Sequence, residues 1–287
     1  MSDISTAPVE QDWSGWVGNR QSQVDTISCE RVRDLAATLG HPQPAKAAAL
    51  PQGWHWIFFN SFVPRAEVGV DGHPKRGGFL PPVPLPRRMW AGGRIEYLAP
   101  LPLGCEATKL SEIVKVEAKS GRRGNLVFVT VRHTIGFASK ICIVEEQDIV
   151  YREAAQPGAP APVLEPAPTA ANWSSQVAPD PVLLFRYSAL TSNGHRIHYD
   201  RDYARNEEAY RDLVVHGPLL ATFLQDQARS ARPTARLRHF SFRGLGPVFV
   251  DASFHVEAKA GGQENELMLW IRDAGGGQAM QASALFD

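Results

Sequence analysis

The chain has 287 residues, 44% of them hydrophobic, and its 30 basic and 30 acidic side chains leave a formal net charge of zero. This composition excludes a largely disordered protein, and a neutral chain without a long Lys/Arg block lacks the positive surface that nucleic-acid binding requires. The acidic N-terminal sequence and the absence of a long apolar run predict no signal peptide and no membrane span, so we expect a soluble, cytoplasmic protein.

The first half predicts one helix followed by strands. The stretch DTISCERVRDLAATLG has helical spacing and ends at Gly40, a residue type that commonly ends helices. Four strand-like segments then follow, with the sequences GRIEYLA, EATKLSEIVKVEAK, NLVFVTVRHTIGF and CIVEEQDIVYR.

Residues 153–182 are rich in proline and alanine, which interrupt every helical or strand period. We interpret this segment as a linker without regular structure. It divides the chain into residues 1–152 and residues 183–287, and each piece has the size of an ordinary domain.

The second half begins with LLFRYSAL, which looks like a strand, and continues to GPLLATFLQDQARSA, a predicted core helix with Pro218 in its first turn. Alternation in VFVDASFHVE then predicts a half-buried strand, with Val248, Val250, Ala252, Phe254 and Val256 on one face. Two further strands are predicted at LMLWIR and AMQASALF.

Two hairpins in the two halves resemble each other. VEAKSGRRGNLVFVTVR (Val116 to Arg132) and VEAKAGGQENELMLWIR (Val256 to Arg272) both contain a strand, a polar turn with glycine, a second strand and a final arginine. The surrounding elements follow in a similar order, which indicates internal duplication. The predicted fold is α+β, with a helix wrapped by a curved antiparallel sheet occurring twice.

The stretch SNGHRIHYD and the later VVHGPLL place polar residues immediately before the core helix of the second half. The first N–H groups of a helix lack internal acceptors and carry partial positive charge, so they can stabilise an oxyanion. Gly217 lets a carbonyl approach this backbone, His198 can exchange a proton near neutral pH, and Asn193 can hold a water. The pattern therefore favours proton transfer next to a carbonyl.

Each of these residues also has a structural interpretation. His195, His198 and His216 can be ordinary histidines with satisfied hydrogen bonds, and His216 can simply shape the entry to the helix. A metal site made from these three is not favoured, because HRIH is too short for a helical i, i+4 pair and no carboxylate or cysteine completes it. The three cysteines, Cys29, Cys105 and Cys142, are widely spaced and predict neither a disulfide framework nor a zinc site.

The segment FRYSALTSNGHRIHYDRDYA followed by LVVHGPLLATFL resembles the hydratase motif of MaoC-like, hot-dog-fold enoyl-thioester hydratases and dehydratases. It is most similar to the branch of 3-hydroxyacyl-thioester dehydratases and mesaconyl-C4-CoA (3-methylfumaryl-CoA) hydratases. RRMWAGGRIEYLAPLPLG, from Arg87 to Gly104, resembles the N-terminal domain of the same branch. The resemblance implies a double hot dog in which residues 1–152 are non-catalytic and shape the substrate groove, while residues 183–287 carry catalysis.

The resemblance also implies a hydro-lyase that adds water reversibly to an enoyl-CoA. In the wider family a carboxylate stands five residues before the catalytic histidine, whereas this chain has Asn193 there, so His198 is expected to transfer the protons while Asn193 positions the water. No redox or metal cofactor is implied, and coenzyme A enters only as part of the substrate. The residues expected to bind the substrate or its oxyanion are His216, Gly217, Arg196, Tyr199, Arg88 and Trp90.

The specific substrate implied by this branch is 3-methylfumaryl-CoA, with (S)-citramalyl-CoA as its hydrated form and with Arg196 or Tyr199 at its free carboxylate. Phosphates of coenzyme A could meet arginines, of which the candidates are Arg87, Arg88, Arg122 and Arg123. Three alternatives stay open: a dehydratase of 3-hydroxyacyl groups on acyl carrier protein or CoA, a thioesterase, for which Asn193 is poorly suited, and a non-enzymatic acyl-CoA-binding protein. A homodimer is also left open.

Overall fold

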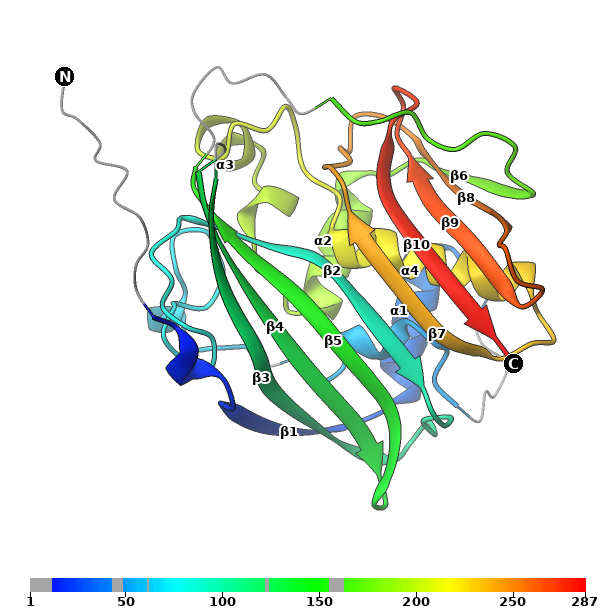
Figure 1. The fold of residues 1–287 in the computed structure, drawn as a ribbon, viewed down its shortest axis with the longest axis horizontal. Coiled ribbons are helices and arrows are strands. Elements are labelled where there is room, and N and C mark those ends of the chain that lie inside the picture. Colours follow the sequence, from blue (N-terminus) through cyan, green and yellow to red (C-terminus); the bar gives the residue numbers. More distant parts are fainter. Residues whose placement is uncertain (1–11, 43–48, 61, 122–123, 155–162) are drawn as a thin grey trace.

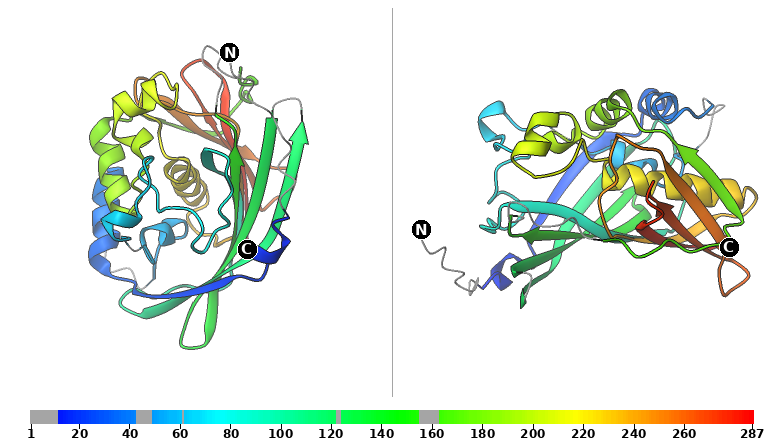
Figure 2. Two further views of the ribbon diagram at one scale, coloured as in Figure 1. Left: turned by 90° about the vertical axis from the view of Figure 1, so that its left-hand side faces the viewer. Right: turned by 90° about the horizontal axis from the view of Figure 1, so that it is seen from above.

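The computed structural model describes residues 12–42, 49–60, 62–121, 124–154 and 163–287. In these residues, ten strands form one antiparallel sheet, in the order β1-β3-β4-β5-β2-β7-β10-β9-β8-β6. The sheet is strongly curved, and the helices lie on its concave side (Figure 1; Figure 2).

The strands β2 to β5 of the first half are longer than any strand of the second half. Their bounds are β1 Arg20–Thr26, β2 Arg87–Tyr97, β3 Glu106–Gly121, β4 Gly124–Phe137, β5 Lys140–Arg152, β6 Trp173–Val177, β7 Leu237–Gly244, β8 Phe254–Ala260, β9 Glu266–Arg272 and β10 Gln278–Phe286.

Four α-helices and several short 3₁₀ turns connect these strands within the described residues. The α-helices are α1 Cys29–Leu39, α2 Pro181–Leu190, α3 Arg201–Asn206 and α4 Gly217–Ala231. The 3₁₀ turns are η1 Ser14–Trp16, η2 Trp54–Ile57, η3 Arg65–Glu67 and η4 Arg196–His198.

The strand order confirms the duplication. Read from either outer edge, the sheet gives the same pattern, because β1-β3-β4-β5-β2 corresponds to β6-β8-β9-β10-β7. The two similar hairpins therefore occupy equivalent places, on β3 and β4 in one half and on β8 and β9 in the other. The halves join where β2 pairs with β7, from Gly92↔Arg243 to Glu96↔His239. The predicted α+β double hot dog is confirmed.

The two halves differ in their central helix. α4 packs on the second-half strands β6 to β10, and its side toward the sheet is buried. α1 instead packs on α2, and in Figure 2 these two helices lie side by side outside α4. The helix predicted within residues 25–40 therefore forms, but the first-half strands do not wrap around it as expected. Among the described residues, no α-helix packs extensively on the first-half strands β1 to β5.

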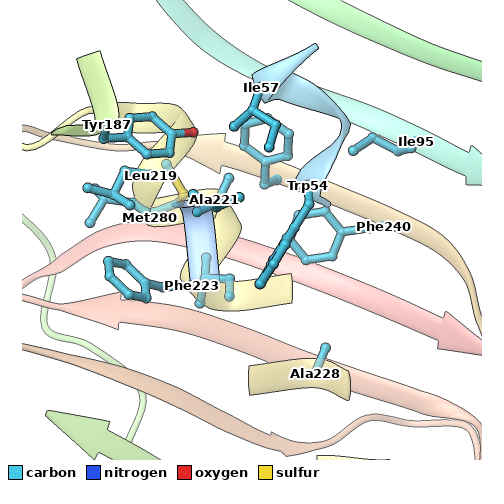
Figure 3. Packing of buried hydrophobic residues seen from close by; sticks show 14 of the residues in the cluster. Trp54, Ile57, Ile95, Tyr187, Leu219, Ala221, Phe223, Ala228, Phe240 and Met280 are labelled. Carbon is cyan, nitrogen blue, oxygen red and sulfur yellow. The ribbon is translucent and has the colours of Figure 1, made fainter. Parts of the chain in front are cut away.

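One continuous core connects the halves. Trp54, Ile57 and Ile95 of the first half belong to the same buried cluster as Leu219 and Phe240 of the second half. Figure 3 shows these side chains around the first turns of α4. The second half is therefore built against the first half rather than beside an independent domain.

Three local predictions need correction. The strand-like LLFRYSAL forms α2, because Asp180 caps the helix by accepting from the Leu183 N–H at 2.7 Å and Pro181 occupies the first turn. The segment 153–182 contains β6, which pairs with β8, and its residues 155–162 lie outside the described part. The strand predicted from Val248 begins only at Phe254, while β7 was not predicted.

All three cysteines have free thiols. Among the described residues, no helix combines the length and the hydropathy that crossing a membrane requires.

Candidate active site

The loop between α2 and η4 positions Asn193. Its backbone N–H donates to the Ser188 carbonyl at 2.9 Å, and its side-chain Oδ1 accepts from the His195 N–H at 3.1 Å. Because the oxygen is used within the turn, the amide NH₂ is the end of Asn193 that can meet a ligand. Asn193 is therefore fixed as a hydrogen-bond donor.

His198 is held in a single tautomer. Its Nδ1 lies 2.7 Å from the Val214 carbonyl oxygen, which can only accept, so Nδ1 carries the hydrogen and Nε2 is bare. The ring is only 6% exposed, and its Nε2 has no hydrogen-bond partner among the described residues. His198 can therefore act as a base through Nε2.

His216 lies behind His198. The two imidazoles stack with ring centroids 3.6 Å apart, and Nε2 of His216 makes a 2.8 Å hydrogen bond with the Ser188 hydroxyl. His216 is fully buried and immediately precedes α4. It fixes the plane of the His198 ring and connects that ring to the start of the helix.

A cavity of about 230 Å³, which we call the catalytic cavity, opens where these elements meet. Among its lining residues are Asn193, His195, His198, Gly217 and Pro218. Pro218 has no N–H, and a Cβ added to Gly217 would meet nothing within 4 Å. Gly217 therefore borders open space in the cavity at the positive end of α4, a place that can stabilise an oxyanion.

A second cavity of about 320 Å³, the inner pocket, lies toward the first half. It shares four lining residues with the catalytic cavity, which are His73, Trp90, Asn193 and Pro218. The two spaces thus adjoin at the catalytic amide.

A first-half loop completes the site. Gly72 has φ of +88° and lies so close to Gly194 that a Cβ would fall 1.9 Å from the Gly194 carbonyl oxygen. The Asp71 carbonyl also accepts from the Arg196 N–H at 2.9 Å. This contact between glycines brings His73 to a ring-centroid distance of 4.2 Å from His195. Only glycine permits both the backbone conformation and the close approach.

Asp71, His73 and His195 offer ligand atoms within 4.8 Å of one another, so they are the residues of the described chain that could hold a metal ion. Nδ1 of His73 lies 3.1 Å from an Asp71 carboxylate oxygen. A proton in this hydrogen bond would compete with a metal ion. The enoyl-thioester chemistry that the sequence predicts proceeds with side-chain acids and bases. It leaves Asp71, His73 and His195 free to position neighbouring groups.

The histidines of the site are neutral. Burial lowers the pKa of His198 to about 3, with a further contribution from His195, and it lowers the pKa of His195 to about 3. Burial also holds the pKa of His216 well below its usual range. Burial would raise the pKa of Asp71, but the hydrogen bond and charge of His73 lower it overall. His198 is therefore an unprotonated base at neutral pH.

This depressed pKa predicts an activity that persists in mild acid. A base must be neutral, so lowering its pKa extends its working range downward, and we expect kcat/KM to change less than about twofold between pH 8 and pH 5. An ordinary histidine of pKa 6.5 would be about 97% protonated at pH 5 and would lose activity about 30-fold. A pH–rate profile measures the difference, and an acid limb near pH 6.5 would contradict the assignment.

Circular dichroism at each pH is the necessary control. Because these histidines have lower pKa values when folded than when unfolded, unfolding takes up protons below pH 6.5. The free energy of unfolding must therefore decrease as pH falls toward 3, and a loss of activity from unfolding has to be separated from a loss of the base.

Most of the predicted site residues gather at the cavities. Asn193, His198, Gly217, Arg88 and Trp90 line the catalytic cavity, whereas His216 lies behind it and does not line it. Arg87 also lines the cavity but pairs with Glu208, with Nε and Oε2 at 3.0 Å. The remaining coenzyme A candidates, residues 122–123, lie outside the described part of the chain.

The structure places the side chains of Arg196 and Tyr199 away from both cavities. The Arg196 guanidinium pairs with Asp200 at 2.7 Å and stacks over the Tyr203 ring, while Tyr199 is 47% exposed and its hydroxyl donates to the Gly194 carbonyl. Neither residue lines either cavity. Because the turn at η4 buries Ile197 and His198, the side chains at 196 and 199 point elsewhere.

Several site residues were missed. Asp71 and His73 come from a loop more than a hundred residues away, and only the paired glycines hint at the contact. The inner pocket is lined by polar residues of the first-half sheet, including Lys109, His133 and Glu145. The sequence signal for Lys109, His133 and Glu145 was the mixture of polar and apolar residues along the predicted strands.

The fold is a duplicated hot dog, and its cavity is lined by the bare imidazole nitrogen of His198, the Asn193 amide and the start of α4. Fold and cavity together are typical of one class of protein, the hydro-lyases that act on acyl thioesters. The chain belongs to the hydroxyacyl-thioester dehydratase type 2 family, whose model matches residues 53–250.

Known relatives agree with this assignment. The chain is 46% identical over 263 residues to mesaconyl-C4-CoA hydratase of Chloroflexus aurantiacus, covering 89% of this chain and 92% of the relative. It is 29% identical to the mitochondrial hydroxyacyl-thioester dehydratase type 2 of Schizosaccharomyces pombe, covering 81% and 87%. A MaoC-like dehydratase structure from Phytophthora capsici superposes with a TM-score of 0.69, covering 94% and 96%. At 12% identity, this last likeness concerns the fold alone.

Proposed function

We propose that this protein hydrates 3-methylfumaryl-CoA, the C4 thioester of mesaconate, to citramalyl-CoA. The observation that carries the proposal is the 46% identity, over nearly the whole of both chains, to a relative that is named for this activity. The site geometry supplies a mechanism for it.

In the proposed reaction, the Asn193 NH₂ donates to the oxygen of a water, and the bare Nε2 of His198 accepts a proton from that water. The water oxygen then forms a bond to the β-carbon while the π electrons of the C=C move toward the thioester carbonyl. His198 subsequently returns the proton to the α-carbon. One histidine can serve both steps because the proton that it removes is the proton that it delivers.

The transient enolate places negative charge on the thioester oxygen. In this proposal the Gly217 N–H at the start of α4 donates to that oxygen, and one well-aimed donor of this kind is worth about 3 kcal/mol. The same negative charge raises the proton affinity of the nearby imidazole during the reaction. A ring with a pKa of about 3 in the free protein can therefore hold a proton at the intermediate.

A second candidate is the dehydration of a 3-hydroxyacyl thioester in fatty-acid synthesis, which the name of the matched family and of the Schizosaccharomyces pombe relative favours. The same residues would run the reaction in reverse. A long acyl chain, however, needs an apolar tunnel, whereas the inner pocket contains Lys109, His133 and Glu145. This lining favours a short polar acyl group.

The test uses the purified protein and a panel of CoA thioesters. We expect rapid loss of the ultraviolet absorbance of the conjugated thioester with 3-methylfumaryl-CoA, and slower loss with crotonyl-CoA and with long-chain 2-enoyl-CoA. Mass spectrometry should find a product heavier by one water. Faster turnover of the long-chain thioester would support the second candidate, and no turnover of any thioester would contradict both.

A further inference from the structure

The inner face of the first-half sheet carries polar side chains where the second half is apolar. Ala107, Lys109, Ser111 and Ile113 share one face of β3, and all except Lys109 are almost fully buried. In the register of the sheet, Ser111 lies opposite His133 on β4, and His133 lies opposite Glu145 on β5. A row of polar groups therefore crosses the concave face of three neighbouring strands.

The second half has nothing comparable. The residues of its inner face beneath α4 are apolar and buried, and they include Phe254, Val256, Ala258, Leu269 and Ile271. On the first-half strands, no α-helix of the described residues packs extensively, and the inner pocket, lined in part by η2, lies above the polar row. Removing a charged group from water costs several kcal/mol unless it gains a partner, so a lysine at such a position indicates a ligand.

Glu145 does not supply that partner. Its carboxylate accepts from His55 Nε2, Trp56 Nε1 and Gln147 Nε2, each at 2.9 Å, so its oxygens are occupied. In the described part of the chain, no carboxylate oxygen lies within 4.0 Å of the Lys109 ammonium nitrogen. That nitrogen lies 5.4 Å from the centre of the Phe59 ring, which lines the same pocket. Lys109 therefore presents a cation without an ion-pair partner to the inner pocket.

The pocket lies where the β-carbon substituents must point. The free carboxylate and the methyl group of this acyl group are both bonded to the β-carbon. With the thioester oxygen at Gly217 and the β-carbon near Asn193, these substituents would face the inner pocket, which shares Asn193 and Trp90 with the catalytic cavity. Nε1 of Trp90 is buried without a hydrogen-bond partner, so the junction also offers an unused donor. The Lys109 ammonium and the Trp90 N–H are together suited to bind a carboxylate, which carries negative charge and accepts hydrogen bonds.

We infer that Lys109 binds the second carboxylate of a dicarboxylic acyl group, and that it is the residue that sets the preference for diacid thioesters. The inference rests on the proposed function and names the residue that recognises the substrate. It replaces Arg196 and Tyr199, which lie outside both cavities.

The experiment compares two thioesters of the same carbon skeleton, 3-methylfumaryl-CoA and its methyl half-ester, in which the carboxylate is neutral. The readout is the ratio of their kcat/KM values. Lys109→Met is expected to lower this ratio at least about 100-fold, because one partner of a desolvated charge pair is lost. Lys109→Arg retains the charge and should keep part of the preference.

Lys115→Met is the matched control, since Lys115 lies on the same strand but its side chain is 62% exposed and pairs with Glu117. Its ratio should equal that of the wild type. Replacing a half-buried, unpaired ammonium with an apolar chain is not expected to unfold the protein. If Lys109→Met nevertheless fails to fold by circular dichroism, Lys109→Gln gives the same comparison.

The outcomes separate the two hypotheses. If the wild type hydrates neither thioester, the proposed function fails and the assignment of Lys109 fails with it. If the wild type prefers the diacid and the Lys109 variants keep that ratio, the proposed function stands and the carboxylate site at Lys109 is overturned. A ratio that collapses only in the neutral Lys109 variants supports the inference.

Discussion

Replacing His198 with alanine is expected to lower kcat for the hydration by about 10³- to 10⁴-fold. General acid–base catalysis contributes about 10²- to 10⁴-fold, and the upper end applies because one imidazole serves both proton transfers. The ring is nearly buried and stacks on His216, so its removal also leaves a cavity. Stopped-flow or steady-state absorbance with 3-methylfumaryl-CoA measures the loss.

His198→Asn separates chemistry from structure. Its amide can still donate to the Val214 carbonyl, as Nδ1 does, but it offers no base. We expect this variant to be as inactive as alanine while it retains wild-type circular dichroism and still binds the thioester in calorimetry. His195→Asn is the matched control and should lose less than about tenfold in kcat.

Activity within tenfold of wild type in His198→Asn would remove the proposed base. A chain that binds acyl-CoA without transforming it makes the same prediction for every variant, because none of them would change function. The His198 series therefore also distinguishes an enzyme from a binding protein.

The duplicated fold could be read from the sequence because it depends on local patterns. Val116 to Arg132 and Val256 to Arg272 repeat one hairpin, and the repeated strand order follows from it. The predicted core helix also forms, with Pro218 in its first turn as expected. Turn residues and alternation sufficed for these elements, since each is decided by a few neighbouring side chains.

Errors occurred where distant partners decide the structure. α2 contains aromatic and branched residues typical of strands, yet Asp180 and Pro181 start a helix that buries Leu184 and Tyr187. β6 lies in a proline-rich segment and forms because the edge of β8 supplies its partner. Neither partner can be recognised from the local sequence.

Only the part of the site that the second half contributes could be predicted from the sequence. Asn193, His198 and Gly217 are close in sequence, so one motif and one helix start define them. Asp71 and His73 reach the site through the contact of Gly72 with Gly194. Lys109 lines a pocket because no α-helix of the described residues packs extensively on its strand. Both facts concern the packing of the two halves, which no single segment encodes.

Replacing Gly217 with alanine is expected to lower kcat/KM by about 10²- to 10³-fold without loss of stability. An added Cβ meets no protein atom within 4 Å, and φ at this residue lies outside the left-handed region, so the folded chain accepts alanine. Alanine is also the better helix former. The methyl group would, however, occupy part of the catalytic cavity beside Gly217, where the proposal places the thioester oxygen.

The decisive result would be that Gly217→Ala keeps or slightly gains stability while it loses activity. Urea unfolding should give a free energy equal to or slightly above that of the wild type, while the absorbance assay shows the loss. Gly15→Ala is the matched control, because a Cβ there also meets nothing within 4 Å but the residue lies far from the cavities in η1. Wild-type activity in Gly217→Ala would mean that the enolate oxygen is stabilised elsewhere, since no bound oxygen could share that space with a methyl group.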